Sequence, residues 1–203
     1  MKIIALILFI ALLLSSCVTQ NTSATNMPIA HPLEPCEDGL FRVNIPISLL
    51  NGWTEKEYIE GIAYNEEALG LFLYIQYIED TGIVITYDSQ LYKEALERFY
   101  TSGMLHIRNY VFSIKNVVYH NELLSEITVY VDASLYNEPF LWNERHAANV
   151  RLATWAGNFQ LLSGVAPDEW FVDITVRCYD TNAIISRNSF PSDDMFEREH
   201  WEW

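Results

Sequence analysis

Positive charge is scarce in this chain. Its 203 residues include 12 Lys and Arg against 27 Asp and Glu, which gives a formal net charge of −15 at pH 7. Nucleic-acid binding depends on Lys and Arg that neutralise phosphates, so this balance argues against a nucleic-acid partner. The folded surface likewise offers no electrostatic attraction to anionic lipid headgroups. The excess of carboxylates permits cation binding, but solvated surface acids explain it more simply.

Recognisable catalytic and cofactor motifs are also missing. The sequence contains no HExxH, no GxSxG, no GxGxxG and no GxxxxGK[ST], which are patterns of metalloproteases, serine hydrolases and nucleotide-binding proteins. None of its three cysteines has zinc-ligand spacing to another. We therefore expect no metal, no cofactor and no motif-based catalytic residue.

Long apolar runs are absent except at the start. After Lys2, residues 3–14 form twelve unbroken apolar positions. Twelve residues are too few for a membrane-spanning helix, which needs roughly 20, but they suit the apolar region of a secretory signal. The following Leu-Ser-Ser-Cys, which ends at Cys17, resembles the lipobox of bacterial lipoproteins. That resemblance implies cleavage before Cys17 and its acylation with two or three chains, enough for stable anchoring.

This resemblance divides the chain into segments with different tasks. We expect a signal peptide (1–16), a lipidated tether (17–39), a single α+β domain (40–190) and an acidic tail (191–203). Removing residues 1–16 takes away one lysine, which leaves 11 basic against 27 acidic residues and a net charge near −16. The folded protein is then held at the membrane through the acyl chains alone. Val18, rather than aspartate, favours the outer membrane under the sorting pattern of enteric bacteria.

In the first half of the domain, the pattern predicts strands, two helices and tight turns. A strand over 41–45 ends at Pro46, and Thr54 begins a capping-box helix. Residues 70–79 are expected to form a buried strand that turns into a second strand over 83–87. A helix follows from Asp88 to Gly103, with apolar side chains at helical spacing.

In the second half, strands are expected over 107–119 and 122–131. Gly157-Asn158 suits the turn of a hairpin over 151–163. From Ala166 the chain has a helix-start signal, although residues 172–178 also alternate as a strand does; the proline and the acids favour the helix. Together these elements predict an α+β fold with a largely antiparallel sheet of about six strands and a few packed helices.

Several landmarks resemble the extrinsic PsbP-type domain of photosystem II. They are the opening FRVNIP…NGW, the later GNFQLLSGVAPDEW and the closing NSF. The resemblance implies a strand ending near Gly157, Asn158 and Phe159, then a helix carrying Trp170, then a close at Ser189 and Phe190. It also implies an assembly or scaffolding role rather than catalysis.

The cysteines other than Cys17 are Cys36 and Cys178. An extracytoplasmic compartment allows them to form a disulfide. They are equally compatible with two free thiols, and the absence of any spacing rule slightly favours the free form.

One polar cluster suits a ligand. Trp142, Arg145 and His146 lie in an expected loop, and a basic pair beside an aromatic ring fits an anionic or sugar group. Salt bridges that cap the loop are the commoner role, and we favour them.

The functional expectation is a lipid-anchored, non-enzymatic module that binds an envelope protein or a small ligand. Two alternatives remain open from the sequence. One is an envelope hydrolase whose site combines His106, His120 or His146 with distant carboxylates. The other is a surface-exposed adhesin.

Overall fold

The structure, a computed structural model, describes residues 33–49, 54–62, 70–78, 82–110, 114–136 and 142–191. The expected signal peptide, Cys17 and most of the tether and tail lie outside these ranges. The elements in chain order are β1 (Phe41–Ile45), η1 (Ile47–Leu49), α2 (Glu55–Ile62), β2 (Tyr74–Ile78), β3 (Gly82–Tyr87), α3 (Ser89–Tyr110), β4 (Ile114–Tyr119), β5 (Glu126–Val131), α4 (Ala133–Tyr136), α5 (Trp142–Leu162), β6 (Val172–Cys178) and β7 (Ile184–Phe190).

The first three strands form one sheet, here called the N-terminal sheet. Its order is β1-β3-β2, with both pairs antiparallel. Side chains of β1 and β3 alternate between faces, so Val43, Ile45, Ile83 and Ile85 enter the hydrophobic core. The strand predicted over 41–45 is confirmed, and β2 lies at one edge of this sheet.

The last four strands form a second, C-terminal sheet with the order β4-β5-β6-β7. Its strands pair antiparallel except β5 and β6, which run parallel. Parallel neighbours need a crossover connection, and here α4 and α5 lie between the two strands in the chain. The expectation of one sheet of about six strands is therefore wrong, although the α+β class and the mainly antiparallel pairing are confirmed.

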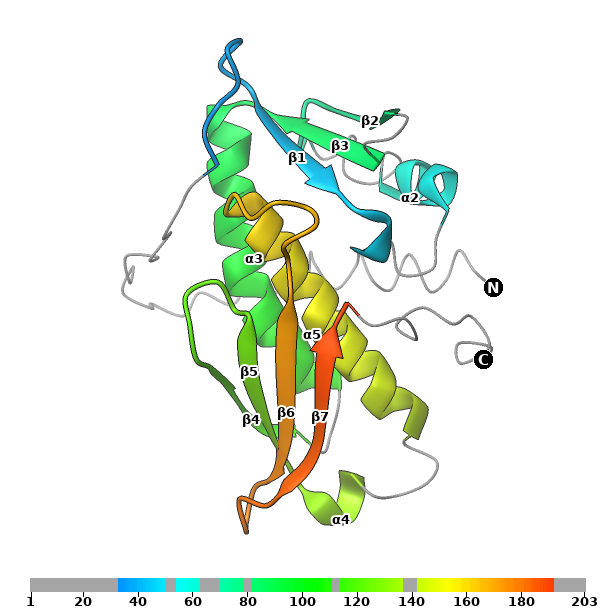
Figure 1. Ribbon diagram of the computed structural model, residues 1–203, viewed down its shortest axis with the longest axis vertical. Coiled ribbons are helices and arrows are strands. Elements are labelled where there is room, and N and C mark those ends of the chain that lie inside the picture. The colour runs from blue at the N-terminus through cyan, green and yellow to red at the C-terminus, as the bar shows by residue number, and fades with distance from the viewer. Residues whose placement is uncertain are drawn as a thin grey trace.

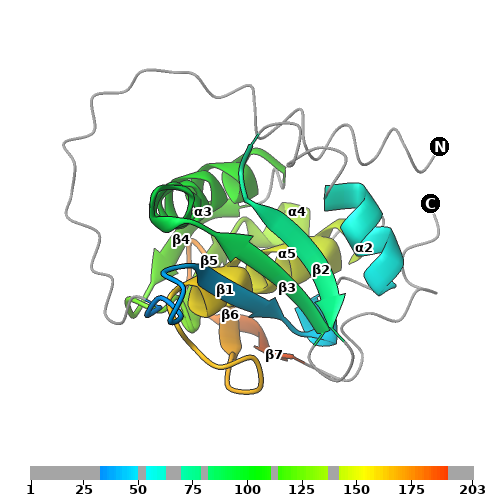
Figure 2. The same cartoon turned by 90° about the horizontal axis from the view of Figure 1, so that it is seen from above.

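Two long helices join the sheets into one structure. Helices α3 and α5 pack side by side, and α5 contacts both β1 and β6. Figure 1 shows the N-terminal sheet near the upper end of this pair and the C-terminal sheet near its lower end; Figure 2 views the N-terminal sheet from above. One continuous apolar cluster includes residues of both sheets and both helices. Among the described residues, no helix is both long and apolar enough to cross a membrane.

Helix α5 replaces the hairpin that the sequence predicted. It is buried on most sides. The neighbouring residues Leu152, Ala153 and Ala156 are all at most 1% exposed. Among its described side chains, only a narrow stripe that includes Arg151, Thr154 and Asn158 is exposed or partly exposed. The usual amphipathic pattern is therefore weak, and the apolar residues on either side of Gly157-Asn158 look like two buried strands.

Two further boundaries differ from expectation. Helix α3 continues past Gly103 to Tyr110, so the strand expected from residue 107 begins only at Ile114. The helix expected after Ala166 is a turn, in which the Glu169 N–H donates to the Ala166 carbonyl. The alternation of residues 172–178 reflects the true structure, since β6 buries every second side chain.

The element order implied by the PsbP-type resemblance is reversed here. Gly157, Asn158 and Phe159 lie within a helix, and Trp170 precedes strand β6 instead of lying on a helix. Trp170 is buried in the core beside Gly157. These landmarks therefore mark a packing contact between α5 and the segment that leads into β6.

Candidate functional site

The two cysteines of the domain are free thiols. Cys36 is exposed and Cys178 is buried, so the disulfide alternative is not formed in this structure. Figure 1 shows why: the loop before β1 and the turn between β6 and β7 lie at opposite ends of the molecule. The Thr181 hydroxyl bonds the Cys178 thiol and lowers its pKa, with further help from backbone N–H groups.

The cluster of Trp142, Arg145 and His146 lies in the first turns of α5. The expected polar loop is therefore wrong at these positions. Spacings of three and four residues place the three positions on one helix face. Their side chains lie outside the described part of the structure, and no site is built on them.

The histidines considered for a composite hydrolase site are dispersed over three elements. His106 is on α3 and His146 on α5, while His120 follows β4. Exposed His120 places its Nε2 at 2.8 Å from the Thr128 hydroxyl. In the described ranges, no three His, Cys, Asp or Glu residues gather as a metal site would require.

One cavity lies between the inner face of the N-terminal sheet and the helices. Its volume is about 50 Å³, and its lining comes from Val43, Ile45, Tyr58, Ile85, Tyr87, Phe99, Asn158 and Leu162. The Asn158 amide is already engaged, since its Nδ2 donates to the Thr154 carbonyl at 2.8 Å. Small-molecule sites usually measure roughly 300–1,000 Å³. This cavity suits a few water molecules rather than a substrate.

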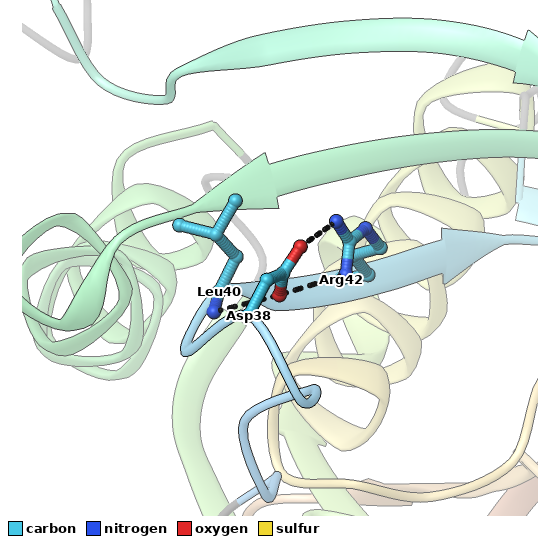
Figure 3. Close-up of polar contacts among 3 residues, drawn as sticks. All are labelled: Asp38, Leu40 and Arg42. Carbon is cyan, nitrogen blue, oxygen red and sulfur yellow. Dashed lines mark hydrogen bonds and ion pairs between the residues drawn. The ribbon is translucent and has the colours of Figure 1, made fainter.

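A polar cluster on the N-terminal sheet centres on Arg42. Its guanidinium donates two hydrogen bonds to the Asp38 carboxylate, one of them from Nη1 at 3.1 Å, and the Leu40 N–H donates to the same carboxylate at 3.1 Å (Figure 3). Hydrogen bonding to Arg42 is the main reason that the pKa of Asp38 is lowered. Hydrogen bonding to the Asp38 carboxylate, with smaller contributions from Cys36 and Tyr74, raises the pKa of Arg42.

The strand register places Arg42 and Tyr74 on the same face of the N-terminal sheet. Arg42 on β1 lies opposite Thr86 on β3, which in turn lies opposite Tyr74 on β2. Arg42 and Tyr74 therefore lie on either side of Thr86 on the outer face of the sheet. Thr86 is fully buried, and its hydroxyl has no hydrogen-bond partner.

Strand β2 is an edge strand with unusually exposed apolar and aromatic side chains. Tyr77 is 51% exposed, Leu73 and Tyr74 are each 41% exposed, and Ile78 is 37% exposed. The strand, YIQYI, contains no charged residue and no proline. Natural edge strands are usually protected by charges, prolines or bulges, because their free N–H and C=O groups accept another strand. Here the outer edge of β2 pairs with no other described strand.

The sequence predicted a strand in this region but described it as buried. Aromatic and β-branched residues indicate a strand equally well at the centre and at the edge of a sheet. The absence of charge from residues 70–78 was the available signal, but only the strand order shows that β2 lies at an edge.

The surface with the clearest capacity for binding is thus the edge of β2. Extended segments bind such edges through backbone hydrogen bonds and side-chain contacts on both faces. No protein-family model matches the chain, and neither the curated proteins nor the solved structures include a similar protein.

Proposed function

We propose that the chain is a lipid-anchored bacterial envelope lipoprotein that acts as a non-enzymatic binding and assembly module through the edge of β2. The observation that carries the binding role is an uncharged, aromatic edge strand whose large side chains are 37–51% exposed. The lipobox-like sequence ending at Cys17 supports the anchor. The same sequence supports a position facing the periplasm or the cell exterior, with the outer membrane favoured in a Gram-negative cell.

The geometry of the attachment suits a domain held near a membrane without lying in it. The Leu33 N–H donates to the Tyr92 hydroxyl at 2.9 Å, and that hydroxyl donates to the Leu162 carbonyl at 2.5 Å. The chain is therefore fixed to the domain at Leu33. The 16 residue steps from Cys17 to Leu33 reach at most ~55 Å when extended, which leaves β2 accessible to partners within the envelope.

An extended protein segment suits β2 better than a small molecule does. A strand added to the edge gains main-chain hydrogen bonds and contacts with Tyr74 on one face and Tyr77 on the other. The cavity beneath the N-terminal sheet is too small for a typical ligand. The net charge of −15 also disfavours nucleic acid. We do not base this role on the PsbP-type resemblance, because the local element order differs.

Anchoring is tested by Cys17→Ala in the native host. We expect the variant to lose acylation and to leave the membrane fraction or be mislocalised, while the domain keeps its circular dichroism spectrum and thermal transition. A variant that is processed and still sediments with membranes after a high-salt wash would refute the anchor.

Binding is tested by photo-crosslinking in native membranes. A photoreactive phenylalanine analogue replaces Tyr77 in one variant and Tyr179 in a control, because Tyr179 is similarly exposed at 56% but lies beyond β6. We expect a discrete protein adduct from position 77 and none, or a different one, from position 179. Identical diffuse adducts from both positions would refute β2 as the binding surface.

A further inference from the structure

The sequence of β2 is nearly symmetric about its central residue. Gln76 has Ile75 and Tyr77 beside it, and Tyr74 and Ile78 beyond them. When such a strand pairs antiparallel with itself about Gln76, each tyrosine faces an isoleucine. The cross-strand pairs are Tyr74 with Ile78 of the second copy, Ile75 with its Tyr77, and Gln76 with its Gln76.

We propose that the occupant of the β2 edge is the β2 strand of a second copy of this chain. A two-fold axis at Gln76 relates the copies and produces a continuous sheet with the order β1-β3-β2-β2-β3-β1. The inference rests on the proposed use of this edge for assembly and names its partner. A two-fold interface uses the same patch on both subunits, so the patch must be complementary to itself.

The side-chain pairs satisfy this requirement on both faces. Tyr74, Gln76 and Ile78 share the outer face with Arg42 and Thr86, while Ile75 and Tyr77 share the inner face with core residues of β3. Aromatic residues opposite β-branched residues are favourable cross-strand pairs. The two Gln76 amides at the axis each offer a donor and an acceptor to the other.

Charge favours this edge as the place where two copies meet. Each chain carries −15, so two copies repel one another over most of their surfaces. Strands β2 and β3 contain no charged residue, and like charges directly opposite one another destabilise a strand pair. Pairing through β2 therefore places no charged side chain of one β2 strand opposite a like charge on the other.

The proposed anchor also favours self-pairing. Acyl chains confine all copies to the plane of one membrane and raise their effective concentration.

Disulfide trapping in native membranes tests both the partner and the register. In a full-length Cys36→Ser, Cys178→Ala background, which keeps Cys17 for lipidation, single cysteines replace Gln76, Tyr74 or Ile78, and diamide is added as the oxidant of the two thiols. Residues opposite each other in an antiparallel pair have Cα atoms roughly 4.5–5.5 Å apart, within disulfide range. We expect a covalent dimer from Gln76→Cys. Tyr74→Cys alone should give none, because its two copies lie ~14 Å apart along the strands.

Two different cysteine variants expressed together test the same two-fold axis independently. Co-expression of Tyr74→Cys and Ile78→Cys chains with different tags should give the mixed dimer. Tyr179→Cys, an exposed position away from β2, serves as the control and should remain monomeric. Dimers of equal yield from Gln76→Cys, Tyr74→Cys and Tyr179→Cys would indicate random collision and overturn the inference.

Charge exchange at the axis provides a test without disulfides. Gln76→Glu and Gln76→Lys each place like charges opposite one another, and each should weaken self-association about fivefold, the upper end for a cross-strand pair. Mixing the two variants should restore association as a Glu–Lys heterodimer. Gln76 is exposed, so neither change should alter the thermal unfolding of the single chain. Unchanged association in all three samples would overturn the pairing.

The outcome separates this inference from the proposed function. If Gln76→Cys gives no dimer while the crosslinker at position 77 captures a different protein, the second copy is wrong and the binding module stands. If position 77 captures only lipid, the edge lies on the membrane, and both the pairing and the protein-binding role fail. Loss of anchoring in the Cys17 test bears on neither the register nor the pairing of β2.

Discussion

Gly157 provides a sharp test of the fold because two physical effects oppose each other there. It lies in the interior of α5, where replacing glycine by alanine normally stabilises a helix by roughly 1 kcal/mol. A Cβ at this position lies 2.8 Å from Trp170 Cε3 and 2.9 Å from Leu49 Cδ2. Both contacts are shorter than van der Waals separation, and both neighbours are at most 3% exposed.

The packing cost outweighs the gain in helix propensity. Inserting a methyl group into a well-packed core costs typically about 1–3 kcal/mol. The Trp170 ring has little freedom to retreat, because its Nε1–H donates to the Ser48 hydroxyl at 3.2 Å. We therefore expect Gly157→Ala to lower the free energy of unfolding by up to about 2 kcal/mol. In a domain of this size the thermal midpoint falls by roughly 2–4 °C for each kcal/mol.

Urea denaturation followed by tryptophan fluorescence measures this change, with the slope of the free energy against urea expected to stay constant. Leu49→Val serves as the control background because it shortens one of the two obstructing side chains. Adding Gly157→Ala there should cost less than in the native sequence, as a double-mutant cycle for contacting residues predicts. A Gly157→Ala variant that is more stable than the native chain would refute the contact between α5 and Trp170.

Three further predictions concern single hydrogen-bonded groups. Gln160→Leu should lower the free energy of unfolding in urea by about 2 kcal/mol, because the buried amide accepts from the Phe171 N–H at 3.2 Å and donates to its carbonyl at 2.8 Å. Thr54→Ala removes the reciprocal capping box at the start of α2 and should cost about 1 kcal/mol in the same assay. Asp38 has a lowered pKa when folded, so its contribution to stability is complete above the unfolded value of 3.8 and is lost as pH falls through the lower folded value. Comparing Asp38→Asn with the native chain by thermal unfolding across pH 2–7 should show a difference that disappears at the acidic end.

Each of these has a result that would contradict it. An unchanged urea midpoint in Gln160→Leu would mean that the Phe171 backbone is satisfied in another way. Equal stability of Thr54→Ala and Thr54→Ser would exclude the cap. A difference between Asp38→Asn and the native chain that grows toward pH 2 would show that the carboxylate is not stabilised by Arg42 in the folded state.

Local signals in the sequence predicted the elements whose stabilisation is local. The strand over 41–45 ends at Pro46, and the capping box at Thr54 forms as expected. Asp88 accepts hydrogen bonds from the Gln90 and Leu91 N–H groups and so caps α3. These features depend on residues within one turn of each other, which a sequence displays directly.

The sequence-based predictions were wrong where tertiary packing, and not the local sequence pattern, determines the secondary structure. Helix α5 lies between the other elements and is buried over most of its described surface, so periodicity could not distinguish it from two strands. At residues 166–169 the proline and acidic residues suit a helix start, but the alternating burial of 172–178 against α5 and β5 determines the strand. Sheet membership depends on pairs far apart in the chain, such as β5 with β6, and no local signal encodes them.

The same division applies to the candidate site. Sequence alone predicts the lipid anchor at Cys17, because signal recognition reads a linear pattern, and it determines the acidic charge that argues against nucleic acid. Only the tertiary structure shows that β2 lies at an edge, that Arg42 and Tyr74 flank Thr86 on one face, and that Cys36 and Cys178 remain apart. The physical reason is that exposure and strand order are set by long-range packing. An uncharged aromatic strand has the same sequence whether another strand covers it or its edge is free to bind one.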